Sequence, residues 1–249
     1  MKLVKLACPY CFTELPDSSK CRSCSFVIIP KEGYIEMHRD DNSWEFCESQ
    51  IKAVRVLEKA DQGGYSEIPS SEEVVPNEHQ LMLEKSLEVL GDLTGKILLD
   101  LGGKGGYCAN FFLNHGAKGV VVLDIDRDQI IKENDKIMSI IGDGYYMPIA
   151  NEQFDFVFDS ASLHHFEHKT VVLKQIDRVL KPGGKYISIG NPPRQGADDD
   201  DRKRYWKDHG LLETMATKSE YEQYFTEVFG HVNFISVAKN MIMYINKGC

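Results

Sequence analysis

Four of the seven cysteines lie in two Cys-x-x-Cys pairs that could bind a metal ion. The pairs are Cys8 with Cys11 and Cys21 with Cys24, and nine residues separate them. Structural zinc is held by four ligands in a tetrahedron, and two tight turns of this kind supply four thiolates. Four ordinary buried thiols are the alternative, and the paired spacing disfavours it. Because four cysteines leave no open position on the metal, the sequence predicts a structural zinc site.

A glycine-rich loop could bind a nucleotide-like ligand. The apolar run 97–101 contains Asp100 and is followed by Gly102, Gly103, Gly105 and Gly106. Glycines between a buried strand and a helix let the backbone approach a ligand closely and present free amides to it. Alone, the loop is a modest signal, because glycine-rich turns serve many nucleotides and some only reverse the chain.

Acidic residues follow the next apolar runs along the chain. Asp124 ends a run about 20 residues beyond the glycines, where a carboxylate can accept hydrogen bonds from both hydroxyls of a ribose. A third run is followed by 142–144, which contains Asp143, and a fourth by Asp159 and Ser160. Helix capping would explain one such aspartate but is a strained explanation for four, Asp100 included. Together they predict a ligand site at the carboxyl ends of neighbouring strands.

A parallel sheet covered by helices would bring these residues together. Short apolar runs alternate with amphipathic helical segments, one of which places Val172, Ile176 and Val179 on one face. The runs are 97–101, 119–124, 137–141, 154–158 and 185–190. Two further runs, 232–237 and 241–245, are close enough for an antiparallel hairpin. The pattern predicts an α/β fold, Rossmann-like, with a seven-stranded mostly parallel sheet, an antiparallel C-terminal hairpin and a small N-terminal zinc ribbon.

The whole of residues 97–190 resembles the class I, type 11 S-adenosylmethionine-dependent methyltransferases. The likeness covers about 95 of the 249 residues. It rests on Leu99–Gly102 with the glycine loop, Asp124, Gly142–Ile149, Phe154–Val157, Leu163–Phe166 and Arg178–Gly184. An NAD-dependent dehydrogenase is the rival for such a fold, but it expects a Gly-x-Gly-x-x-Gly loop and would leave several of these segments unexplained.

The resemblance implies that S-adenosylmethionine is the cofactor and assigns residues to it. Asp100 and the four glycines would hold its methionine end, and Asp124 with the neighbouring Ile125 would bind the ribose. Asp143, beside Gly144, would contact the adenine, and Ser160 would line the methyl side. Lys104 departs from the family, which usually has a glycine there; a lysine at positive φ is costly and could weaken cofactor binding.

The domain organisation follows from these assignments. Residues 1–36 form the zinc-ribbon module, 37–76 a helical linker region, and 77–249 the methyltransferase domain, with a polar insertion at 191–218. The net charge of −9 disfavours general attraction to nucleic acid or anionic lipid. We expect a cytoplasmic protein that does not bind membranes, because the sequence has neither an export signal nor an apolar run of about 18 residues.

The acceptor of the methyl group is less clearly encoded. His165 and His164 are candidates for a catalytic base, although such a pair can also be structural. A small-molecule acceptor is the favoured interpretation. RNA is an alternative, because the cysteine module resembles zinc ribbons fused to ribosomal RNA methyltransferases; those usually have histidine where this chain has Cys24. A non-catalytic scaffold is a third possibility, and Lys104 is its main support.

Overall fold

The computed structural model describes residues 3–15, 20–24, 26–38, 78–191, 193, 214–237 and 240–248. Apart from residues 37 and 38, the helical linker region expected at 37–76 lies outside the described residues. The insertion expected at 191–218 is described only at 191, 193 and 214–218.

The described strands and helices alternate only in part, because a loop without a helix joins β4 to β5 and only a 3-10 turn lies between β5 and β6. The strands are β1 (Val27–Lys31), β2 (Tyr34–His38), β3 (Ile97–Leu101), β4 (Gly119–Asp124), β5 (Ile137–Ile141), β6 (Phe154–Ser160), β7 (Leu180–Ile189), β8 (Asn233–Val237) and β9 (Asn240–Asn246). The helices are α2 (Glu78–Leu90), α3 (Tyr107–Asn114), α4 (Lys169–Val179) and α6 (Lys218–Phe229), with 3-10 turns η1 (Gly144–Tyr146) and η2 (Leu163–His165).

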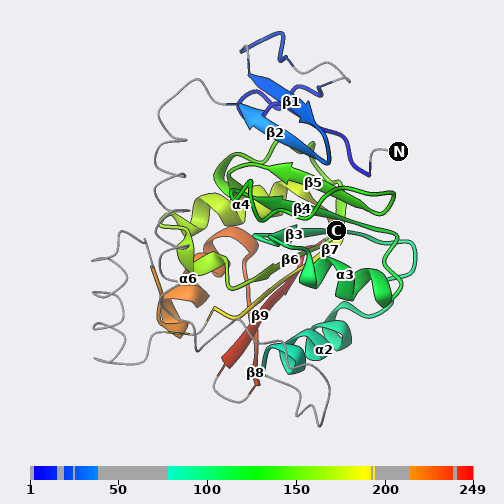
Figure 1. The fold of residues 1–249 in the computed structure, drawn as a ribbon. Helices are drawn as coiled ribbons and strands as arrows, with labels where there is room; N and C mark the ends of the chain where they lie inside the picture. The colour runs from blue at the N-terminus through cyan, green and yellow to red at the C-terminus, as the bar shows by residue number, and fades with distance from the viewer. Residues whose placement is uncertain are drawn as a thin grey trace.

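These strands form a single mixed sheet in the order β1-β2-β5-β4-β3-β6-β7-β9-β8 (Figure 1). The pairs from β5 to β7 are parallel, and β9 is antiparallel to both β7 and β8. The expected fold class, with its parallel centre and antiparallel C-terminal hairpin, is confirmed.

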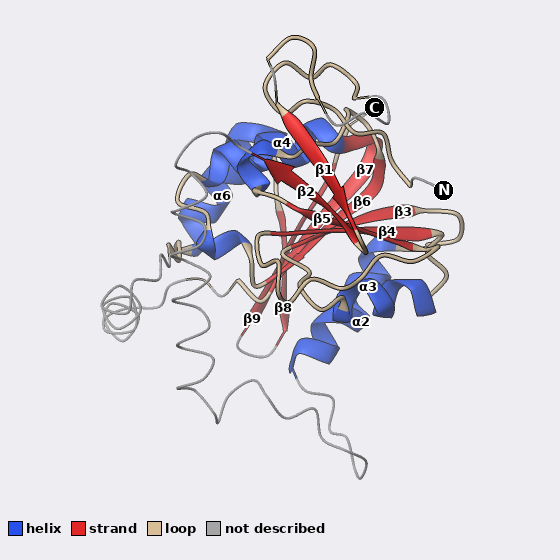
Figure 2. Ribbon diagram, turned by 45° about the horizontal axis from the view of Figure 1, so that its top comes forward, coloured by secondary structure: helices blue, strands red, loops and turns tan. Residues whose placement is uncertain are grey.

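Alternate residues of each strand enter two separate cores. Helices α4 and α6 cover one face of the sheet, and α2 and α3 cover the other (Figure 2). Leu99 and Leu101 pack on the α4–α6 side, whereas Leu98 packs on the α2–α3 side. Because side chains of a strand alternate between faces, Asp100 projects to the same side as Leu98. This alternation decides which polar residues at the strand ends can share a site.

The N-terminal module is joined to this sheet. Strand β2 pairs in parallel with β5, with Ile35 opposite Ile140, so the hairpin β1–β2 extends the sheet at one edge (Figure 1). The buried Glu36 forms an ion pair with Arg127, in the loop after β4. The sequence predicted a separate small module and did not indicate that its hairpin would continue the sheet.

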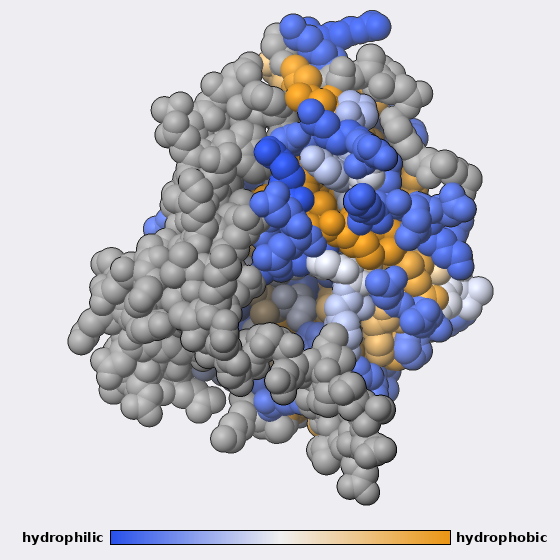
Figure 3. Space-filling model, in the orientation of Figure 1, coloured by the Kyte–Doolittle hydropathy of each residue, from blue (hydrophilic) through white to orange (hydrophobic). Residues whose placement is uncertain are grey.

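The surface of the described residues is mostly hydrophilic in one view, with an apolar band across its middle (Figure 3). Among these residues, no helix has both the length and the apolar character needed to cross a lipid bilayer.

Candidate functional site

The site lies at β3, where the order in which successive strands are added to the sheet reverses. From β3 the chain continues to β4 on one side, and β6 pairs on the other side of β3. Open α/β sheets bind ligands in the crevice at such a switch point, outside the carboxyl ends of the strands. The ends of β3 and β6 bring together Asp100, the glycine loop and Ser160.

Asp100 is a buried carboxylate that lacks a partner. Its residue exposure is 1%, and neither carboxylate oxygen has a well-formed hydrogen bond to a described residue, although the nearby Ala109 amide of α3 partly offsets the rise in its pKa. A Cβ atom at Gly103 would lie 2.4 Å from its Oδ2 atom, so only glycine fits above it. Burial, reinforced by the nearby charge of Asp124, raises the pKa of Asp100 to about 7. The ionised Asp100 carboxylate is costly to bury without a compensating charge, so it favours binding of a cation.

The glycine loop is anchored by backbone hydrogen bonds. The Gly102 amide, at φ +77°, donates to the Leu123 carbonyl over 2.8 Å, and the Lys104 amide donates to Asp124 Oδ2 over 3.1 Å. Lys104 itself has φ +37°, in the region that favours glycine. The departure from the family pattern therefore coincides with backbone strain, while the loop keeps its bond to Asp124.

Asp124 is buried and held by two amides. Oδ1 accepts a hydrogen bond from the Asp126 amide over 2.8 Å, and Oδ2 accepts the one from Lys104. Burial raises the pKa of Asp124, and these two amides counteract the rise. A carboxylate has about four acceptor positions, so two remain for donors from a ligand. Ile125, which follows, is partly buried.

Asp143 begins the short turn η1. Its Oδ1 atom accepts a hydrogen bond from the Tyr145 amide over 2.8 Å, which caps this turn. The next residue, Gly144, packs so closely that an added Cβ would lie 2.7 Å from the Phe166 ring. The bond orients the carboxyl group at the carboxyl end of β5, beside β4 and its terminal Asp124.

Ser160 ends β6 and meets a histidine that the sequence did not single out. His79 Nε2, in the first turn of α2, lies 2.9 Å from Ser160 Oγ. The buried residues of α2 are Met82, Leu83, Ser86 and Leu90. His79 lies three and four residues before the first two, on the same helical face, and this spacing could have found it.

Asp159 projects to the face of the sheet opposite Asp100 and Ser160, although it also lies at a strand end. Its neighbour Val157 packs in the α4–α6 core, so Asp159 projects to that face, opposite Ser160. There it accepts hydrogen bonds from Tyr186 Oη over 2.8 Å and from Asn191 Nδ2 over 2.9 Å. Burial raises the pKa of Asp159, and these bonds counteract the rise.

The two candidate bases differ in their surroundings. His164 is 9% exposed, and its Nδ1 atom lies 2.8 Å from Asn191 Oδ1. His165 is exposed, and the two rings lie 4.0 Å apart. His164 is therefore fixed within the buried network, whereas the His165 ring is accessible to solvent.

Replacing Asn191 by alanine is expected to lower the free energy of unfolding by about 3 kcal/mol. The Asn191 Nδ2 atom has two hydrogens and lies within 2.9 Å of acceptors on Asp159, Ser188 and the Ile189 carbonyl, so its loss leaves buried polar groups without partners. Denaturant unfolding measures the change. The exposed Asn114 provides a matched control, and equal stability of the Asn191→Ala and Asn114→Ala variants would contradict this prediction.

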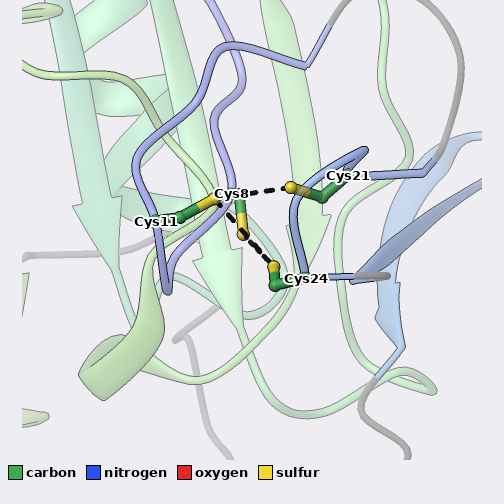
Figure 4. A group of neighbouring side chains, drawn as sticks. All are labelled: Cys8, Cys11, Cys21 and Cys24. Atoms are coloured by element: carbon green, nitrogen blue, oxygen red, sulfur yellow. Dashed lines mark hydrogen bonds between the residues drawn. The ribbon is translucent and has the colours of Figure 1, made fainter.

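The four cysteines of the two pairs converge (Figure 4). Their Sγ atoms all lie within 4.8 Å of one another, and the distances between Cys8 and Cys24, Cys11 and Cys21, and Cys11 and Cys24 are 3.0, 3.4 and 4.0 Å. Four sulfurs about 2.3 Å from zinc in a tetrahedron would be about 3.8 Å apart. The cluster therefore fits a tetrahedral zinc ion.

Comparisons with known proteins agree with this geometry. Residues 99–188 match the family described as "Methyltransferase domain". The ubiquinone/menaquinone biosynthesis C-methyltransferase UbiE of Nitrosospira multiformis is 32% identical over 120 residues, which are 45% of this chain and 49% of that protein. The methyltransferase GfsG of Streptomyces halstedii is 30% identical over 146 residues, 55% of this chain and 52% of that protein. The chain spans about half the length of these curated relatives.

Two solved structures share the fold. A putative methyltransferase from Bacillus halodurans is 22% identical with a TM-score of 0.53, covering 62% of this chain and 70% of that one. The 1,6-didemethyltoxoflavin-N1-methyltransferase of Burkholderia thailandensis is 13% identical with a TM-score of 0.60. The match covers 93% of this chain and 100% of that one. The fold and the family match define a class of protein: the chain contains a class I S-adenosylmethionine-dependent methyltransferase domain.

Proposed function

We propose that this protein transfers a methyl group from S-adenosylmethionine to a small-molecule acceptor and carries a structural zinc ion in its N-terminal module. The family of residues 99–188 supports the cofactor. The names of relatives support the acceptor class, because they describe enzymes that methylate quinone precursors or toxoflavin precursors.

Asp100 is the observation that carries the proposal. A buried carboxylate with no partner is costly unless a ligand supplies the missing donor. The amino acid portion of S-adenosylmethionine carries an ammonium group of the required charge. Gly103 lets the loop backbone pass close to Asp100, where any side chain would clash with the carboxylate.

The bound cofactor would supply a methyl group on a positively charged sulfur, which leaves with the electron pair of the broken carbon–sulfur bond. Asp100 would bind the ammonium, Asp124 the ribose hydroxyls and Asp143 the adenine amino group. With the cofactor so fixed, catalysis consists mainly of holding the acceptor in line with the methyl carbon. His165, the exposed last residue of η2, is the better placed of the two candidate bases to take a proton from the acceptor.

The experiment has two stages. Calorimetric titration with S-adenosylhomocysteine is expected to give a dissociation constant in the micromolar range, about 8 kcal/mol of binding free energy. Transfer of a labelled methyl group is then measured with quinols, nitrogen heterocycles and total RNA as acceptors. Label on a small molecule supports the proposal, whereas label on RNA alone would replace the acceptor class. Absence of cofactor binding at millimolar concentration would favour a non-catalytic scaffold.

A further inference from the structure

His79, in the first turn of α2, contacts residues from two other elements of the fold. Its ring bonds to Ser160 at the end of β6 and lies 5.6 Å from the Tyr107 ring, at the start of α3. Tyr107 in turn donates to Gln80 Oε1 over 3.2 Å. The first turns of α2 and α3 therefore meet over the carboxyl ends of β3 and β6, where the amino acid portion of the cofactor is proposed to bind.

Strand register places Asp100 close to the same point. Asp100 is opposite Phe158 in the parallel pair β3–β6, and Ser160 is two residues further along β6. Phe158 packs on the α2–α3 face, so Asp100 and Ser160 both project to that side. Strand spacing and rise separate their Cα atoms by about 8 Å. An amino acid moiety is long enough to bridge groups that far apart.

The negative charges of the site limit which residues can bind the carboxylate of that amino acid moiety. Asp100 and Asp124 are both buried carboxylates, and either would repel the cofactor's own carboxylate. A carboxylate bound beside them needs a donor on the side of the crevice away from Asp124. Among the described residues, the His79–Ser160 pair provides imidazole and hydroxyl donors on that side.

We infer that His79 binds the carboxylate of the cofactor's amino acid moiety, while Asp100 binds its ammonium. The inference rests on the proposed function and extends it with a residue from a helix outside the residues that match the family. Ser160 orients the ring: if its hydroxyl donates to Nε2, the proton of a neutral imidazole is on Nδ1, which can then donate to the carboxylate. His79 is thus a binding residue and Ser160 its positioning residue.

The test compares two ligands that differ in the carboxylate alone. S-Adenosylhomocysteine has both charged groups, whereas S-adenosyl-3-thiopropylamine keeps the ammonium and lacks the carboxylate. We expect the unmodified protein to bind S-adenosylhomocysteine at least tenfold more tightly. In His79→Leu that preference is expected to fall to within about twofold, because the charge-assisted hydrogen bond is lost. Calorimetry measures both dissociation constants.

Two further variants separate binding from folding. His79→Asn keeps an amide donor near the Nδ1 position and is expected to retain most of the preference. His115→Leu alters an exposed histidine at the other end of α3 and should change neither affinity. If His79→Leu weakens both ligands equally, or leaves the preference intact, the inference is wrong. Failure of the unmodified protein to bind either ligand would instead overturn the proposed function.

Discussion

Replacement of Asp100 by asparagine is expected to weaken binding of S-adenosylhomocysteine about 100-fold and to make the ligand-free protein more stable at pH 8. The binding loss follows from the removal of a charge-assisted hydrogen bond to the ammonium, which contributes about 1.5–3 kcal/mol in a buried setting. Both results come from the same feature, a carboxylate held without a partner.

The stability change follows from the shift in pKa. Burial raises the pKa of Asp100 from 3.8 to about 7, so the folded state binds its proton more tightly than the unfolded chain does. The folded state is therefore destabilised progressively as the pH rises from about 4 to about 7, and the penalty persists above that range. A shift of this size corresponds to about 4 kcal/mol. Asparagine has no such penalty, but its buried amide lacks partners, so we expect a net gain on the order of 2 kcal/mol at pH 8.

Denaturant unfolding at pH 4.5 and pH 8, with calorimetry at pH 8, measures both effects. At pH 4.5 Asp100 is protonated in the folded protein, so the gain should disappear and Asp100→Asn should be no more stable than the unmodified protein. Asp135→Asn, which changes an exposed carboxylate in the loop before β5, is the matched control. Unchanged affinity in Asp100→Asn would remove the main support for the proposed cofactor site.

Loss of the proposed zinc site is expected to lower the thermal stability of the protein strongly. Cys8→Ser removes one of four converging ligands and should abolish the one zinc ion expected per chain. Structural zinc sites contribute free energies on the order of 10 kcal/mol to folding of their own module. We expect the hairpin β1–β2 to separate from the sheet edge and the thermal midpoint to fall by more than about 10 °C.

The effect should extend to the cofactor site. The module touches the segment after Asp143, through a hydrogen bond from the Ala7 amide to the Pro148 carbonyl and a ring contact between Tyr10 and Tyr146. It also touches the segment after Asp124, through the Glu36–Arg127 ion pair. We therefore expect affinity for S-adenosylhomocysteine to fall about tenfold when zinc is lost.

Elemental analysis, thermal unfolding and calorimetry measure these three quantities. Cys108→Ala, which alters a buried cysteine of α3 away from the cluster, should retain the zinc ion. A Cys8→Ser protein that keeps its zinc content and its melting temperature would contradict the prediction. Equal cofactor affinity with and without zinc would show that the module does not support the site.

Several features were accessible from the sequence because they depend on local pattern. Alternating apolar runs and amphipathic helices predicted the strands from β3 to β9, although β7 begins earlier than expected, at Leu180. The spacing of the two cysteine pairs predicted the cluster that forms. Glycines at 102 and 106 were expected at the turn, and both have positive φ there. Each of these signals lies within a few residues of the structure it specifies.

Only the tertiary structure decided how distant segments meet. It placed Ser160 on the same face of the sheet as Asp100, and its neighbour Asp159 in a buried network on the opposite face. It also brought His79 to Ser160 from 81 residues away and joined β2 to β5. The periodicity of a sequence predicts that a residue is buried, but it does not predict which helix or strand covers it. Which element covers a residue depends on packing between segments far apart in the chain. The free energy of that packing cannot be read from a local sequence pattern.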